Sequence, residues 1–131
     1  MASQYEAGKC NIGIDEINYR RRIVGYGSAI ILAALYTILV YFNFPLITYL
    51  VLIIPIFISG HGFKEAKTKF CTSYAKSGKY NMSSDIGITQ DVLSGVKRKQ
   101  DIKHANLLLK QSAKTSFIIL ILLIAASRLV N

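Results

Sequence analysis

The side chains best suited to hold a metal or to carry out thiol chemistry are two cysteines and two histidines. They are Cys10, Cys71, His61 and His104. Two thiolates and two imidazoles can complete the tetrahedral shell of a zinc ion, so these four residues define a hypothetical zinc site. The chain has no C-x-x-C or H-x-x-x-H pair, and the ten-residue step from His61 to Cys71 would cover about 15 Å along a helix. Free cysteines without a metal are therefore the alternative.

Basic neighbours give the two thiols further chemical options. Lys9 adjoins Cys10 and Lys69 lies near Cys71, and a nearby cation lowers the pKa of a thiol and makes it more reactive. Cys10 could instead be acylated beside a bilayer. A disulfide between Cys10 and Cys71 is geometrically conceivable, but a reducing cytoplasm would ordinarily keep both thiols free.

Motifs of the common enzyme classes are missing from the chain. It contains no P-loop, no G-x-S-x-G elbow and no H-E-x-x-H pair. Its three long apolar stretches also contain no Asp, Glu, Lys, Arg or His, although proton-coupled carriers need such groups within the membrane. The sequence favours a non-catalytic protein and disfavours a transporter that acts alone.

Three uncharged apolar stretches predict three transmembrane helices. They run from Ile23 to Phe42, from Phe44 to Gly60 and from Thr115 to Ser127. A helix needs about 20 apolar residues to cross a hydrocarbon core of about 30 Å. The third stretch is the shortest, but Lys114 and Arg128 at its ends can extend toward opposite headgroup layers.

The connections between these stretches predict an all-α integral membrane protein with helical cytoplasmic extensions. The turn around Asn43 and Pro45 is so short that the first two helices must form a hairpin. We expect one further helix from Phe63 to Gly78 and another from Thr89 into the third span, paired as an antiparallel hairpin or lying flat on the membrane. The expected segments are a cytoplasmic N-terminal segment (1–22), a transmembrane hairpin (23–60), a cytoplasmic amphipathic hairpin (61–115) and the third transmembrane helix with the C-terminus (116–131).

The placement of basic residues predicts the orientation of these helices. Four of the 16 Lys and Arg residues precede the first apolar stretch, eleven lie between Lys64 and Lys114, and only Arg128 follows the third stretch. Basic loops are retained on the cytoplasmic side of a membrane. In this multi-pass protein the N-terminus is therefore expected in the cytoplasm and the C-terminus outside.

The basic side chains near the membrane are also candidate contacts for anionic lipid or for a partner. They are Arg20, Arg21, Arg22, Lys99, Lys103, Lys110 and Lys114. Clustered juxtamembrane Lys and Arg are attracted to anionic headgroups. Topology and solubility alone are the alternative explanation. Nucleic acid is not an expected partner, because no zinc-finger spacing, RNA-binding signature or helix-turn-helix pattern accompanies the charge.

Small side chains recur every four residues in the first apolar stretch. Gly25, Ala29 and Ala33 form a narrow stripe on one helical face, and such a stripe lets another helix approach closely. The second span of the same chain is the expected neighbour, with a second copy of the protein as the alternative.

Several short motifs occur together in the first two thirds of the chain. They are Cys10-Asn11-Ile12-Gly13, the triplet Arg20 to Arg22, Gly62-Phe63, Ala66 followed by Phe70-Cys71, Gly78 and Asn81. In these residues the chain resembles a group of small, uncharacterised bacterial integral membrane proteins. The resemblance covers roughly residues 10–81. It implies a bacterial source and a joint role for Cys10 and Cys71, and it implies no activity.

Three functional hypotheses follow from these patterns. The first is a non-catalytic membrane subunit or scaffold that needs no cofactor and docks a partner, a second copy or anionic lipid on its basic face. The second is a thiol-based metal or redox protein, with zinc as its metal. The third is an oligomeric channel or carrier built from copies of the hairpin.

Overall fold

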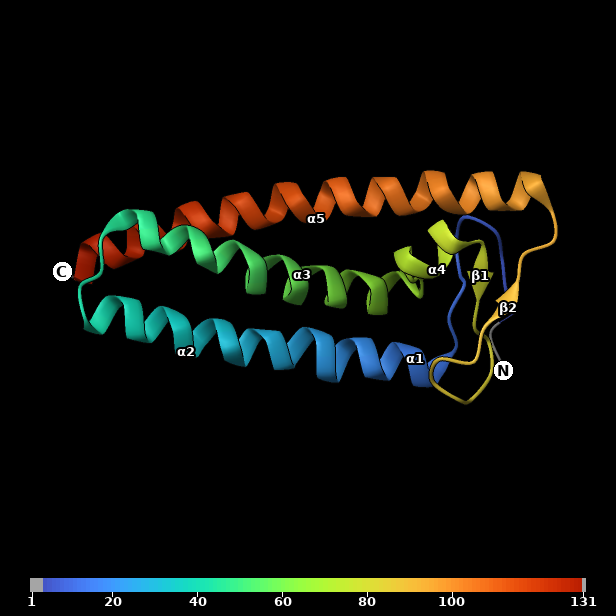
Figure 1. Ribbon diagram of the computed structural model, residues 1–131, viewed down its shortest axis with the longest axis horizontal. Helices are drawn as coiled ribbons and strands as arrows, with labels where there is room; N and C mark the ends of the chain where they lie inside the picture. Colours follow the sequence, from blue (N-terminus) through green and yellow to red (C-terminus); the bar gives the residue numbers. More distant parts are fainter. Residues whose placement is uncertain (1–3, 131) are drawn as a thin grey trace.

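The computed structural model describes residues 4–130 and consists of three long helices side by side, with a smaller region at one end (Figure 1). We call this smaller region the polar head, and it comprises residues 4–13 and 69–94 together with the adjoining ends of the long helices. The helices and strands are α1 (Ile14–Tyr19), the π-helical segment η1 (Arg20–Gly27), α2 (Ser28–Tyr41), the 3-10 segment η2 (Leu46–Leu52), α3 (Ile53–Thr68), α4 (Thr72–Ser77), β1 (Lys79–Tyr80), β2 (Gln90–Asp91) and α5 (Gly95–Val130). Residues 1–3 and 131, at the ends of the first and last predicted segments, lie outside this description.

Three continuous helices are long and apolar enough to cross a membrane, as the sequence predicts. They cover Ile14–Tyr41, Leu46–Thr68 and Gly95–Val130, with 28, 23 and 36 residues. The first combines α1, η1 and α2, and the second combines η2 and α3. About 20 residues suffice to cross a bilayer, so the helices extend beyond the apolar stretches and contribute to the polar head.

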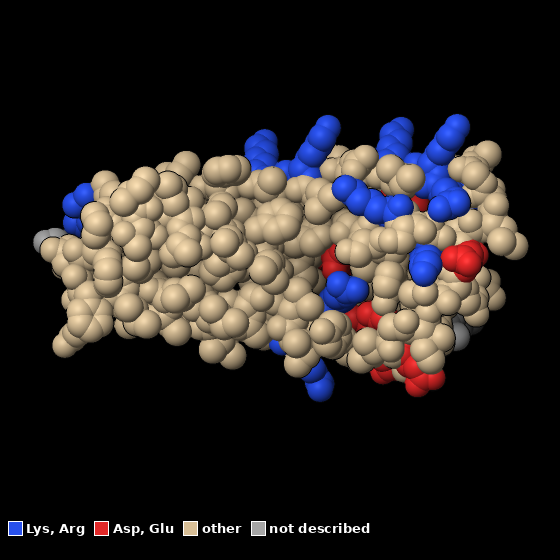
Figure 2. Space-filling view, viewed as in Figure 1, with Lys and Arg blue, Asp and Glu red and all other residues tan. Residues whose placement is uncertain are grey.

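The apolar half of the bundle has a thin core and an apolar exterior. Leu39, Tyr49, Leu52, Ile56 and Leu120 are buried together where the three helices meet. Large side chains on the outer faces are mostly exposed, and the surface of this half carries almost no charge (Figure 2). An exposed apolar surface of this extent requires an apolar surrounding or a partner.

The first and second long helices approach most closely at two glycines. Gly25 lies under the ring of Phe63, and the hydroxyl of Ser59 donates a 2.8 Å hydrogen bond to the Gly25 carbonyl oxygen. Gly25 is buried in this contact, whereas Ala29 is half-buried and Ala33 is exposed. The predicted small-residue stripe thus meets α3 of the same chain at its Gly25 end.

Gly62 in α3 provides a test of this packing. A Cβ atom at this position would lie 2.7 Å from Val24 Cγ1 and 3.1 Å from the Gly25 nitrogen. We therefore expect Gly62→Ala to lower the free energy of unfolding by about 1–3 kcal/mol, the usual cost of overpacking. Gly60→Ala is the matched control, because its Cβ meets nothing within 4 Å, and a gain of up to about 1 kcal/mol is expected from helix propensity. SDS-induced unfolding in detergent measures both, and equal effects would contradict the packing argument.

The helix expected to run on to Gly78 is interrupted, and this part of the prediction is wrong. α3 ends at Thr68 because Lys69 adopts a left-handed conformation with φ of 57°. The chain then turns and buries Phe70 against Ala105 and Leu108 of α5. Burial of these apolar side chains outweighs continuation of the helix. The predicted end of the helical region at Gly78 is confirmed, since this glycine caps α4 with φ of 69°.

The long last helix begins at Gly95, six residues later than its predicted start at Thr89. Gln90 and Asp91 instead form β2, which pairs antiparallel with β1 at Tyr80 and Lys79. Ser94 precedes the helix, and its carbonyl oxygen accepts the Arg98 N–H at 3.1 Å. The chain between α3 and α5 thus contains one short helix, α4, and one minimal sheet. α4 packs on α5 in place of the longer hairpin that the sequence predicts.

Candidate functional site

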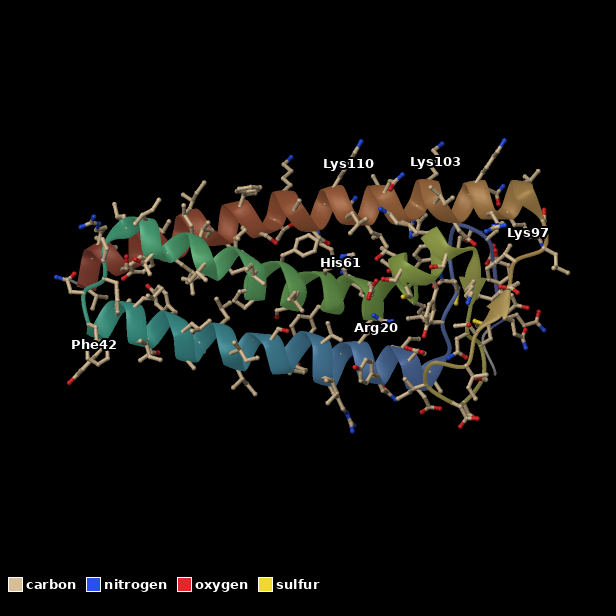
Figure 3. All side chains as sticks on the ribbon, in the orientation of Figure 1. Arg20, Phe42, His61, Lys97, Lys103 and Lys110 are labelled. Atoms are coloured by element: carbon tan, nitrogen blue, oxygen red, sulfur yellow. The ribbon has the colours of Figure 1, made fainter. Side chains whose placement is uncertain are left out.

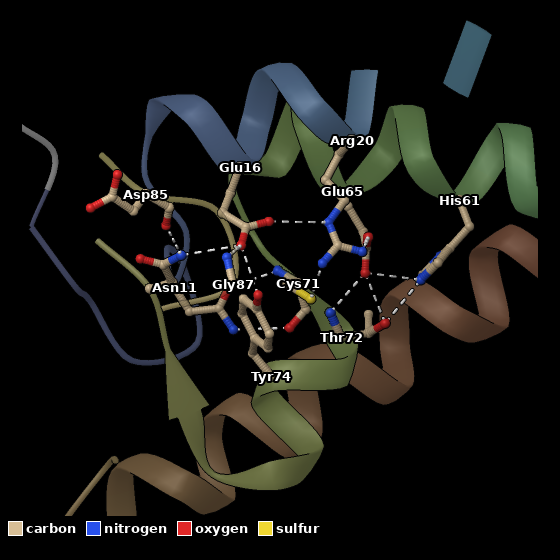
Figure 4. Close-up of polar contacts among 11 residues, drawn as sticks. Asn11, Glu16, Arg20, His61, Glu65, Cys71, Thr72, Tyr74, Asp85 and Gly87 are labelled. Atoms are coloured by element: carbon tan, nitrogen blue, oxygen red, sulfur yellow. Dashed lines mark hydrogen bonds and ion pairs between the residues drawn. The ribbon is translucent and has the colours of Figure 1, made fainter. Parts of the chain in front are cut away.

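A cluster of buried polar side chains lies where the polar head meets the apolar bundle (Figure 4). Figure 3 shows Arg20 and His61 of this cluster pointing inward, between the helices. We call this set the buried polar cluster, and its members are Asn11, Glu16, Arg20, His61, Glu65, Cys71, Thr72, Tyr74 and Asn81.

Helical spacing places the charged members of the cluster. Glu16 and Arg20 are four residues apart on the first long helix, and His61 and Glu65 are four residues apart on α3. Residues at this spacing lie on the same helical face. The turn after α3 then returns Cys71 and α4 to these two faces.

Glu65 is a buried carboxylate with partners on two other elements. Its Oε1 accepts hydrogen bonds from the Thr72 N–H at 2.8 Å and from the Thr72 hydroxyl at 2.9 Å. Its Oε2 lies 3.2 Å from Arg20 Nη1 in an ion pair. The carboxylate is only 2% exposed, so these partners replace the water that a buried charge requires.

His61 links three helices around this carboxylate. Its Nε2 lies 2.9 Å from the hydroxyl of Thr72 and 3.3 Å from Glu65 Oε1. Its Nδ1 lies 2.9 Å from the hydroxyl of Ser112 on α5. The ring also stacks on Phe57, with the ring centres 5.4 Å apart. Both ring nitrogens are therefore engaged within the protein.

Arg20 is turned into the protein and does not share the surface position of its neighbours. Its Nη2 donates a 3.1 Å hydrogen bond to Cys71 Sγ, and its guanidinium lies over the ring of Tyr74. Its Nε is 3.7 Å from Glu16 Oε2 and has no hydrogen-bond partner among residues 4–130. Arg21 and Arg22 are exposed. Of the predicted Arg triplet, only these two remain available to lipid or to a partner.

Glu16 holds together segments that are far apart in the sequence. Its Oε1 accepts hydrogen bonds from the Tyr74 hydroxyl at 2.7 Å, the Asn81 amide at 3.1 Å and the Gly87 N–H at 2.9 Å. These bonds fix α4 and the loop before β2 to the start of the first helix. Burial and the hydrogen bond to Glu16 raise the pKa of Tyr74 to about 12.

Burial governs the chemistry of Cys71. It raises the pKa of the thiol to about 11, and the Glu65 carboxylate raises it further than the Arg20 cation lowers it. The expectation that Lys69 activates this thiol is wrong, because Cys71 is fully buried and Lys69 is exposed. The Cys71 thiol takes part in no disulfide within residues 4–130, and the Sγ of the half-buried Cys10 lies 3.7 Å from the Ile12 carbonyl oxygen.

The four predicted zinc ligands have separate partners. His61 contacts Thr72 and Ser112, Cys71 contacts Arg20, and His104 packs edge-to-face on Phe70 with the ring centres 4.5 Å apart. Across residues 4–130, no three His, Cys, Asp or Glu side chains converge in a metal-binding group. A zinc site formed by Cys10, Cys71, His61 and His104 stays a prediction from the sequence.

Lysines on the outer face of α5 form the second notable feature. Lys99, Lys103, Lys110 and Lys114 are exposed, and the labelled Lys103 and Lys110 point away from the bundle (Figure 3). We call these four residues the lysine face. Figure 2 shows basic side chains in a row along this edge of the molecule. The only acidic residue of α5, Asp101, is fully buried and accepts hydrogen bonds from the Tyr5 hydroxyl and the Gly8 N–H, both at 2.7 Å.

A cavity of about 570 Å³ opens beside the lysine face. The N-terminal segment forms one wall with Gly8 and Lys9, and α5 forms the other with Lys103, His104 and Lys110. The hydrogen bonds to Asp101 hold the N-terminal wall in place. Three lysines thus border one cavity, and none of the described residues that line it carries a carboxylate.

The bonding of the buried polar cluster indicates a structural role, in which it holds the surrounding helices in one position. Its two carboxylates are bonded to donors from the first helix, the turn after α3 and α4, and its thiol is protonated at neutral pH. Such a network specifies one arrangement of the elements around it. It positions the polar head against the bundle, while the lysine face and its cavity remain open to a ligand.

Sequence reasoning missed the acidic members of this cluster and both of its asparagines. The spacing of four residues in Glu16–Arg20 and in His61–Glu65 was the available signal, because it predicts charged pairs on one helical face. Comparisons of the chain with protein-family models, with curated proteins and with solved structures find no match.

Proposed function

We propose that this protein is a small accessory subunit of a bacterial cytoplasmic membrane, which docks an acidic segment of a partner protein on its lysine face. In this proposal the three long helices cross the membrane and the polar head lies in the cytoplasm. The charge distribution supports this orientation, since only Arg128 of the 16 Lys and Arg residues follows the third apolar stretch.

The direction of α5 favours a protein partner over lipid for the lysine face. α5 is one continuous helix, so the 15 residues between Lys99 and Lys114 cover about 22 Å along its axis. Attraction to an anionic leaflet falls off within a Debye length, about 8 Å at physiological salt. Lys99 and Lys103 therefore lie beyond the reach of the leaflet, whereas a folded partner can contact the whole face.

The observation that carries the proposal is the cavity bordered by Lys9, Lys103 and Lys110. Lys9 is paired with Glu6, but Lys103 and Lys110 form no ion pair within residues 4–130. Asp101 nearby is committed to Tyr5 and Gly8. An Asp or Glu side chain of a partner would supply the missing charge. Charge complementarity of this kind directs association and selects the partner.

The test compares two triple variants, one that removes three positive charges from the lysine face and one that removes three positive charges from other exposed positions. K99Q/K103Q/K110Q is expected to lose the partner that co-purifies with the wild type from native membranes, because the complementary charge is gone. R22Q/K76Q/K79Q removes equal charge at exposed positions and is expected to retain it. A photo-crosslinker at Asn106, which lines the cavity, should label the same partner, whereas one at exposed Ile86 should not. Equal loss in both variants, or equal labelling, would contradict docking at the lysine face.

A further inference from the structure

We propose that a groove between η1 and α3 binds one anionic phospholipid of the cytoplasmic leaflet. The proposal rests on the membrane insertion proposed above and uses none of the residues of the lysine face. The groove encloses about 510 Å³, which is within the range of cavities that hold small ligands.

The groove has an apolar end and a basic end. Tyr26 and Phe63 form the apolar end, where their rings pack edge-to-face with the centres 4.9 Å apart. Arg21 of η1 lies on one side of the basic end, and Lys67 and Lys69 lie on the other. Buried Ile17 and Ala66 also line the groove.

The apolar and basic ends of the groove match the acyl chain and the phosphate of a phospholipid, in the order in which these groups lie across a leaflet. Tyr26 lies three residues inside the first apolar stretch, and Arg21 lies two residues outside it. Phe63 lies three residues after the second apolar stretch ends at Gly60, followed by Lys67 and Lys69 toward the polar head. An acyl chain along Tyr26 and Phe63 would therefore place its phosphate beside the three cations, at the depth where headgroups lie.

The three cations of the groove have no acidic partner in the part of the chain that the structure describes. The ion pairs formed within residues 4–130 involve Lys9, Arg20 and His61, and none involves Arg21, Lys67 or Lys69. All three are exposed or at the rim of the groove. The contrast with neighbouring Arg20, which is paired with Glu65, shows that this positive charge is left uncompensated. A lipid phosphate at the same depth would compensate it.

The test measures lipid retained by the full chain purified in detergent, using native mass spectrometry. Phosphatidylglycerol and phosphatidylcholine are added separately at equal concentration. We expect the wild type to retain one phosphatidylglycerol and at least ten-fold less phosphatidylcholine. R21Q/K67Q/K69Q should lower phosphatidylglycerol retention about ten-fold. K99Q/K103Q/K110Q removes the same charge from another surface and should leave retention unchanged.

Two further experiments ask whether phosphate alone suffices for binding and whether the apolar end contributes. Millimolar inorganic phosphate should not displace the lipid. Tyr26→Ala should lower lipid retention several-fold, whereas Tyr19→Ala, at a position outside the groove, should leave lipid retention unchanged. Displacement by phosphate, equal retention of the two lipids, or equal loss in both triple variants would overturn the proposal. Release of the wild type from native membranes by alkaline carbonate would instead refute insertion. If the wild type retains the lipid but no partner co-purifies with it, only the proposed function would be refuted.

Discussion

Glu65→Gln is expected to lower the free energy of unfolding by about 3–5 kcal/mol, the usual cost of removing one partner of a buried ion pair. The substitution keeps the shape of the side chain but removes the charge that faces Arg20 Nη1 at 3.2 Å. It also places an amide beside Thr72, whose N–H and hydroxyl both donate to Glu65 Oε1. Glu16 compensates Arg20 poorly, since its Oε2 is 3.7 Å from Arg20 Nε.

Unfolding of the purified protein in dodecylmaltoside, titrated with SDS and followed by circular dichroism, measures this effect. Glu6→Gln is the matched control, because Glu6 is an exposed carboxylate paired with exposed Lys9, and its loss should leave the unfolding curve unchanged. Arg20→Met combined with Glu65→Leu removes both charges. The loss in free energy of unfolding of this double variant should be smaller, by about 0.5–3 kcal/mol, than the sum of the losses measured for Arg20→Met and Glu65→Leu separately. Additive effects would show that Arg20 and Glu65 are not coupled.

The three long helices could be predicted from sequence because their signal is local. An uncharged stretch such as 23–42 identifies a helix without knowledge of its neighbours, and the structure ends this helix at Tyr41. The short turn at Asn43 likewise requires two adjacent antiparallel helices. These inferences depend on composition and connection length, which the sequence displays directly.

The break between α3 and α4 could not be predicted in the same way. The residues around Lys69 have no helix-breaking Gly or Pro, and the helical periodicity continues through them. The break is stabilised by burial of Phe70 on Ala105 of α5, a contact that joins residues 35 positions apart in the sequence. The strand at Gln90 and Asp91 depends equally on its distant partner β1.

The buried polar cluster shows the same limit at the level of single residues. Arg20, Arg21 and Arg22 are chemically identical in the sequence, and their grouping suggests one basic surface. Only the packing of η1 against α3 turns Arg20 toward Glu65 and leaves the other two exposed. The lysines of α5 were easier to predict, since their spacing places them on one face of a helix.

Asn11 belongs to the N-terminal segment that precedes α1, and it is fully buried. Its amide nitrogen donates to the Cys71 carbonyl oxygen at 2.9 Å, and its Oδ1 accepts the Cys71 N–H at 2.6 Å. Its backbone N–H donates to the Lys69 carbonyl oxygen, and its carbonyl oxygen accepts the Asn81 N–H. One residue thus connects the N-terminal segment to the turn after α3 and to the segment that follows β1.

Asn11→Ala is therefore expected to lower the free energy of unfolding by about 2–4 kcal/mol in the same SDS titration. It leaves the buried Cys71 N–H without a partner, which costs about 1–3 kcal/mol, and removes one further hydrogen bond worth about 1 kcal/mol. The Cys71 carbonyl oxygen keeps its bond from the Ala75 N–H, which limits the loss. Asn106→Ala, at an exposed position of α5, should change stability by less than about 0.5 kcal/mol. Similar results for the two variants would mean that the Asn11 side chain does not hold the turn in place.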